Sequence, residues 1–94
     1  MAWTFSSASI LSAQTQSTGS NYTTFSTQAC WALDIANNSG VAIEYRRDGT
    51  GNTIAIPTGA SRLVLGIYNA NQISIRRVDQ SNTQVTVTAE ALTV

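Results

Sequence analysis

The sequence contains no histidine and no lysine, and only one of its 94 residues is a cysteine. Histidine is the commonest general base, the usual partner of a nucleophilic serine or cysteine, and the commonest metal ligand, so its absence excludes the ordinary catalytic triads. The single cysteine, Cys30, cannot form a disulfide within the chain, and without histidine it cannot build a structural zinc site. We therefore expect a protein that is not an enzyme and that has no cofactor and no bound metal.

Charged side chains are also scarce. Five acidic residues and five arginines make up 11% of the chain and cancel to a net charge of zero. A chain without net charge has no long-range field to attract nucleic acid or anionic lipid, so we expect neither as a partner. Zero net charge leaves little repulsion between copies, and a small domain without disulfides gains stability from oligomerisation. These features favour a homo-oligomer that works by its surface within an assembly.

Long apolar runs are missing as well. No stretch approaches the roughly 18 apolar residues that a membrane-spanning helix needs. The first residues of the chain lack the basic region and the apolar core of a secretory signal. We expect no membrane contact and no export.

The first part of the chain differs in composition from the rest. Residues 1–28 contain 13 serines and threonines and no charged side chain. Such a segment has little apolar surface to offset the entropy of ordering, but Trp3 and Phe5 alternate as they would in a strand. We expect an extended N-terminal arm or an edge strand over residues 1–28 that orders on a neighbour, followed by a β-sandwich domain over residues 29–94.

From residue 29 onward, apolar side chains recur at every second position between clusters of turn residues. No window shows a sustained helical repeat. The pattern predicts an all-β fold of six to eight short antiparallel strands, arranged as a small β-sandwich or a small barrel. The alternating groups are Trp31, Leu33 and Ile35; Val41, Ile43 and Tyr45; Ile54 and Ile56; Leu63, Leu65 and Ile67; Ile73 and Ile75; and Val85, Val87 and Ala89.

Aromatic side chains allow two interpretations. Trp31 and Tyr45 lie in phase with core aliphatic residues, which assigns them to the core. Cys30, next to Trp31, is expected to be a small buried apolar residue. Tyr68 falls in a turn and is expected to be exposed. A sugar-stacking platform built from such residues is the alternative.

The acidic residues offer no obvious acid and base pair, because all five are spread singly along the sequence. The loop 48–52 has oxygen-bearing side chains at alternate positions, as calcium loops do, but it lacks their later bidentate glutamate. Asp48 and Asp79 are expected to bond to the backbone of their own turns.

Two arginine pairs are the main candidates for a binding surface. Arg46 and Arg47 follow Ile43 in the same way that Arg76 and Arg77 follow Ile73, which indicates either an internal duplication or a coincidence. Alternation places Arg46 and Arg76 on the outer face of the sheet and the other two near its rim. The arginines pair either within the chain, with Glu44, Asp48 or Asp79, or with carboxylates of a neighbouring subunit. The interface residues expected from the sequence are Trp3, Phe5, Arg46, Arg47, Arg76 and Arg77.

Four stretches carry a resemblance to a known family: Ile35-Ala36-Asn37-Asn38-Ser39-Gly40-Val41, Tyr45-Arg46-Arg47, Ile56-Pro57-Thr58-Gly59-Ala60 and Ile75-Arg76-Arg77. In this pattern, over about residues 33 to 89, the chain resembles small virion proteins of tailed bacteriophages, which combine such turns in a compact β-sandwich.

The resemblance implies a capsid decoration or cement protein, located in the virion after assembly in the host cytoplasm. The partners that it implies are the major capsid protein or another virion protein, with a homotrimer as the favoured oligomer. A tail or fibre component, or a carbohydrate-binding or receptor-binding module, is the alternative function.

Overall fold

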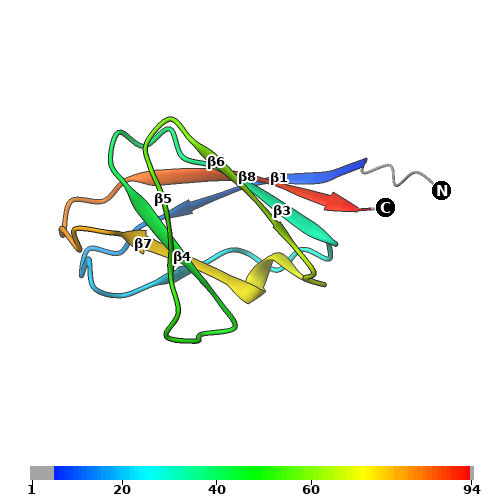
Figure 1. Ribbon diagram of the computed structural model, residues 1–94, viewed down its shortest axis with the longest axis horizontal. Helices are drawn as coiled ribbons and strands as arrows, with labels where there is room; N and C mark the ends of the chain where they lie inside the picture. The colour runs from blue at the N-terminus through cyan, green and yellow to red at the C-terminus, as the bar shows by residue number, and fades with distance from the viewer. Residues whose placement is uncertain (1–5, 94) are drawn as a thin grey trace.

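The computed structural model describes residues 6–93 and arranges them in two four-stranded antiparallel sheets (Figure 1). The first sheet has the strand order β1 (Ser6–Gln14), β8 (Thr86–Thr93), β3 (Ala32–Ala36) and β6 (Ser61–Leu65). The second has the order β2 (Thr23–Thr24), β7 (Ile73–Arg77), β4 (Ile43–Arg47) and β5 (Ile54–Ile56). One short 3-10 helix, η1 (Ala70–Gln72), precedes β7. The predicted all-β fold is confirmed, and two packed sheets make it a sandwich.

The core lies between the inner faces of the two sheets, where the period-two pattern places its apolar side chains. Cys30 and Tyr45 are buried, as predicted. Burying one such aliphatic or aromatic side chain contributes about 1.5–3 kcal/mol. The core side chains include Leu33, Ile35, Val64, Val87 and Ala89 from the first sheet and Ile43, Tyr45, Ile56, Ile73 and Ile75 from the second.

The segment that precedes residue 29 is part of this sandwich. Ser6–Gln14 forms an edge strand, β1, as one predicted alternative had it, but it pairs antiparallel with β8 of its own chain and not with a neighbour. Thr15 continues the contact, because its backbone N–H donates to the Val85 carbonyl at 2.8 Å, and Phe25 is 2% exposed within the common core. Residues 6–28 are therefore not an extended arm, and the expected boundary at residue 28 does not separate two units. Trp3 and Phe5 lie outside the described residues.

Three predicted core positions, Trp31, Leu63 and Leu65, are wrong. Trp31 precedes β3 and is 56% exposed instead of buried. On β6 the strand turns Val64 inward, opposite Leu33, so that Leu63 and Leu65 point outward. Gly66 then adopts a φ of 76°, which breaks the alternation and returns Ile67 to the core.

The similarity between the two arginine segments does not mark a repeated hairpin. β4 and β7 lie side by side and antiparallel, with Glu44 opposite Arg76. β5 follows β4 in the same sheet, whereas β8, which follows β7, belongs to the other sheet. The pairing nevertheless places Arg46 and Arg76 on one outer face.

Asn37 joins the two turns that carry the sequence resemblance. Its side chain is fully buried, and Nδ2 donates to the carbonyls of Val41 at 2.9 Å and Ile56 at 2.8 Å. Its Oδ1 accepts from both the backbone N–H and the hydroxyl of Ser39. The Asn37 backbone bonds to Ala60 and Gly59 on the other turn. The amide therefore satisfies its two donor and two acceptor positions inside the protein.

Gly19 fixes the loop between β1 and β2 against the turn that follows β7. Its backbone N–H donates to Asn82 Oδ1 at 2.9 Å. A Cβ atom at this position would overlap the backbone carbonyl oxygens of Gln80 and Ser81. The close approach of the two backbones therefore requires glycine.

The substitution Asn37→Ala should lower the free energy of unfolding by about 1–3 kcal/mol, because it removes both Nδ2 hydrogen bonds and leaves the Ser39 hydroxyl as the remaining side-chain donor to the Val41 carbonyl. Urea unfolding followed by circular dichroism measures the loss. The neighbouring exposed residue provides the control, since Asn38→Ala should change stability by less than about 0.5 kcal/mol. Equal stability of the two variants would contradict the role of the amide.

The substitution Gly19→Ala should cost about 1–3 kcal/mol, since the added methyl group forces the two backbones apart. Gly51→Ala is the matched control, because a Cβ there meets no atom within 4 Å and the backbone needs no positive φ. Thermal unfolding of both variants tests the contact. A Gly19→Ala variant as stable as Gly51→Ala would show that the loop is not held against the turn.

Candidate functional site

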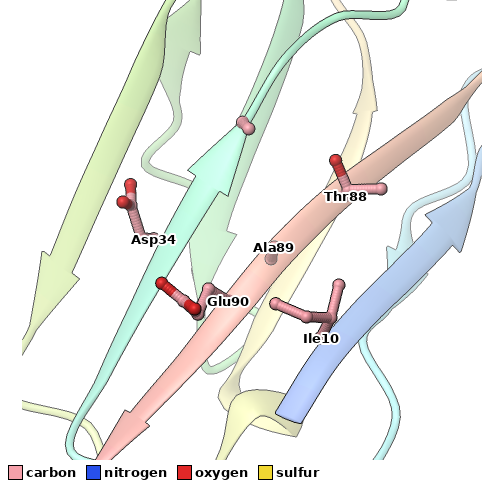
Figure 2. A pocket seen from close by; sticks show the side chains of 6 residues that line it. Ile10, Asp34, Thr88, Ala89 and Glu90 are labelled. Atoms are coloured by element: carbon pink, nitrogen blue, oxygen red, sulfur yellow. The ribbon is translucent and has the colours of Figure 1, made fainter. Parts of the chain in front are cut away.

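The outer face of the first sheet carries two acidic side chains in adjacent strands. In the antiparallel register, Glu90 of β8 lies opposite both Ile10 of β1 and Asp34 of β3, and Asp34 lies opposite Leu63 of β6. These four residues form a line across the sheet that we call the acidic row. Figure 2 shows the carboxylates of Asp34 and Glu90 next to each other, with Ile10 beside them over an open hollow of about 260 Å³.

The two carboxylates of the acidic row have no opposite charge paired with them among the described residues. Like charges directly opposite each other on a sheet are destabilising. Among residues 6–93, no side chain forms an ion pair or hydrogen bond with Asp34 or Glu90; the two ion pairs there use Glu44 and Asp79. The fold thus holds two negative charges together without a partner of its own, and a cation from outside the chain would relieve their repulsion.

Apolar side chains surround these charges. Ile10 is 66% exposed and Leu63 is 45% exposed at the two ends of the acidic row. The next row on the same face places Leu65 opposite Ala32 and Ala32 opposite Leu92, and it ends at Ser7 of β1. Exposed apolar side chains gathered on one face of a sheet are typical of a contact surface.

The outer face of the second sheet holds a different cluster, centred on Tyr22. The guanidinium carbons of Arg46 and Arg76 lie 3.8 and 4.4 Å from the centroid of the Tyr22 ring. The Tyr22 hydroxyl donates to Glu44 at 3.3 Å. Desolvation, and then the charge of Glu44, raises the pKa of Tyr22. Tyr22 therefore covers this face from within the chain.

The other contacts of Arg76 also lie within the chain. Its Nη1 donates to the Ser20 carbonyl at 2.8 Å, and its Nε lies 3.5 Å from Glu44 in an ion pair that lacks hydrogen-bond geometry. Within residues 6–93, Arg46 makes no ion pair, and its buried Nε has no hydrogen-bond partner. The two outward-facing arginines are thus placed where the alternation predicted, but only Arg76 has a carboxylate partner.

Arg77 is a structural residue. It is 8% exposed, and its Nε and Nη2 donate to the two oxygens of Asp79 at 2.9 and 2.8 Å. Its Nη1 donates to the Thr83 carbonyl. The predicted pairing within the chain is confirmed for Arg77 with Asp79 and for Arg76 with Glu44. Asp48 instead accepts a hydrogen bond from Gln72.

Three arginines lie close together at the side of the sandwich where β5 and β6 are the edge strands of their sheets. Arg47 reaches from the second sheet to the first and donates to the carbonyls of Leu65 at 2.9 Å and Gly66 at 3.5 Å. Arg62 of β6 reaches the other way, and its Nε donates to the Tyr45 hydroxyl at 3.3 Å. With Arg46 they line a hollow of about 220 Å³ that we call the basic pocket; it is completed by Tyr45, Thr50, Asn52 and Ile54 and has no acidic lining residue.

Sequence reasoning found part of these surfaces. It placed Arg46 and Arg47 among the candidates but missed Arg62, which joins them only because the two sheets stack. It also missed the acidic row, because Asp34 and Glu90 are far apart in the sequence and only the pairing of β3 with β8 brings them together. The interface role of Arg46, Arg47, Arg76 and Arg77 stays a prediction. Tyr68 is 75% exposed, as predicted.

Residues 6–93 contain no group of three or more histidine, cysteine, aspartate or glutamate side chains placed to hold a metal ion. No helix formed by these residues is long and apolar enough to span a membrane.

The ion pair of Asp79 should make stability depend on pH in the acid range. The hydrogen bonds from Arg77, and then from the Ser81 backbone, hold the pKa of Asp79 below its ordinary value of 3.8. A carboxyl whose pKa is lowered by folding stabilises the protein above the unfolded pKa, and this contribution is lost as the pH falls through the folded value.

Asp79→Asn should therefore lower the urea midpoint at pH 6, and the difference from the unsubstituted protein should shrink at pH 2. Urea titrations at the two pH values measure it. A difference of equal size at both would show that the charge of Asp79 contributes nothing.

Comparison with known proteins adds no relative. No protein-family model, no curated protein and no solved structure matches this chain. A function for the protein therefore rests on its own residues and their geometry.

Proposed function

We propose that the protein is a non-enzymatic structural component of a larger assembly, and that it docks on a neighbouring subunit through the outer face of its first sheet. The observation that carries the proposal is the acidic row with its apolar neighbours. Two half-buried carboxylates without a partner lie between apolar side chains that are 45–66% exposed. A partner that covers this face gains apolar burial and, with a cation, relieves the repulsion between Asp34 and Glu90.

The assembly that we propose is the virion of a tailed bacteriophage, with the chain as a capsid decoration or cement protein. The resemblance of the two turns at residues 37–40 and 56–60 to those of small virion proteins supports this. The same turns are the ones that Asn37 ties together, so the resemblance falls on residues that hold the sandwich. The absence of histidine supports a structural role over a catalytic one. The proposed oligomer is a homotrimer that contacts the major capsid protein.

Virions that contain the protein are the test material. In purified particles the chain should be present in many copies, and capsids stripped of it should rebind the purified protein. Leu63→Ser removes an exposed apolar side chain from the docking face and should weaken rebinding about tenfold, the equivalent of about 1.4 kcal/mol. Sedimentation of the capsids with bound protein measures the change.

Val78→Ser is the matched control, because Val78 is similarly exposed at 43% but lies in the turn after β7. It should rebind like the unsubstituted protein. Equal rebinding of Leu63→Ser and Val78→Ser would overturn the docking face, and absence of the chain from purified virions would overturn the proposed assembly.

A further inference from the structure

We propose that copies of this chain join head to tail, with the acidic row of one copy seated against the basic pocket of the next, and that these contacts close into a ring. The inference rests on the proposed function and names the occupant of its docking face: a second copy of the same chain.

The distribution of charge carries this step. All ten charged side chains lie among the described residues. Two pairs are joined within the chain, Arg76 with Glu44 and Arg77 with Asp79. The arginines that remain, Arg46, Arg47 and Arg62, all line the basic pocket. Two of the three remaining acids, Asp34 and Glu90, share the acidic row. Apart from Asp48, which accepts a hydrogen bond from Gln72, the side-chain charges of residues 6–93 that lack an ion pair are thus sorted by sign onto two surfaces of one molecule.

The pocket arginines have donors suited to carboxylates. Arg47 donates to backbone carbonyls, and Arg62 donates to a tyrosine hydroxyl, so neither positive charge is neutralised. Arg46 also lines the pocket, and its guanidinium carbon lies over the Tyr22 ring rather than against a carboxylate. Bonds between guanidinium and carboxylate groups are about twice as strong as bonds between neutral groups. Ile54, 43% exposed at the pocket, offers an apolar contact for Leu63 or Ile10 of the partner copy.

A second copy fits these observations better than nucleic acid does. Net charge is zero, so the chain has no bulk field that attracts a polyanion, and two copies do not repel each other. Each copy carries one acidic row and one basic pocket, so the two complementary surfaces are present in equal numbers. Opposed patches of opposite sign favour association in one register.

The placement of the two surfaces produces a turn at every contact, which a closed ring requires. The acidic row lies on the outer face of the first sheet, whereas the basic pocket lies at the edge formed by β5 and β6. The directions to the two neighbours are therefore not opposite, as they would be in a straight filament. A head-to-tail contact that turns at every step generates a ring when the rotation closes.

Charge reversal tests the contact in the purified protein alone. Asp34→Arg with Glu90→Arg makes both surfaces basic, and Arg47→Glu with Arg62→Glu makes both acidic. Each double variant should associate at least about tenfold more weakly than the unsubstituted protein. The variant with all four substitutions restores opposite charges and should recover the oligomer mass. Sedimentation equilibrium measures mass, and circular dichroism checks the fold of each variant.

Two controls accompany these variants. Ser17→Arg with Ser26→Arg adds positive charge at exposed positions outside both surfaces and should leave the oligomer intact. Raising the salt concentration above 0.1 M, where the screening length falls below about 10 Å, should weaken association. If the fourfold variant does not fold, the two double variants should associate with each other when mixed, whereas each of them alone associates weakly.

A monomeric unsubstituted protein, double variants with unchanged mass, or a folded fourfold variant that stays monomeric would each overturn the ring. Capsid rebinding that is lost with Leu63→Ser while the purified protein is monomeric would assign the acidic row to the capsid protein, which overturns the ring and leaves the proposed function standing. Rings that form in solution while the chain is absent from virions would leave the ring standing and overturn the proposed function.

Discussion

The buried amide of Asn37 is the contact on which the arrangement of the two sheets depends. It lies between β3 of the first sheet and the turn toward β4 of the second, and it donates to Val41 and Ile56 while its backbone bonds to Gly59 and Ala60. One residue therefore fixes where the chain leaves the first sheet and where it returns. An apolar side chain at this position would remove the two Nδ2 hydrogen bonds to the Val41 and Ile56 carbonyls, so an amide stabilises this junction.

The stacking that this contact fixes also creates the two charged surfaces. At the side where β5 and β6 are the edge strands, the stacked sheets bring Arg47 and Arg62 together. Arg46 completes the basic pocket. On the first sheet, the pairing of β3 with β8 sets Asp34 beside Glu90. Both surfaces depend on contacts between strands that are distant in sequence. The fold thereby gathers the few unpaired charged side chains into the acidic row and the basic pocket.

Sequence reasoning identified most strands and the all-β class because burial between two sheets imposes a period of two on residues such as Ile43 and Tyr45. It failed at Leu63 and Leu65, since alternation does not say which of two faces a sheet buries. It failed at Trp31, which stands just before a strand rather than in it. It could not find the acidic row or the place of Arg62, because cross-strand register and sheet stacking leave no local signal in one sequence.

The proposed function has one central requirement: in the assembled state the outer face of the first sheet is covered by a neighbouring subunit. Electron microscopy of the native assembly, at a resolution that traces individual strands, tests it most directly. The account predicts Asp34 and Glu90 buried against the arginines of an adjacent copy, with Leu63 in the same contact. An assembly in which β1, β8, β3 and β6 turn this face toward solvent would contradict it.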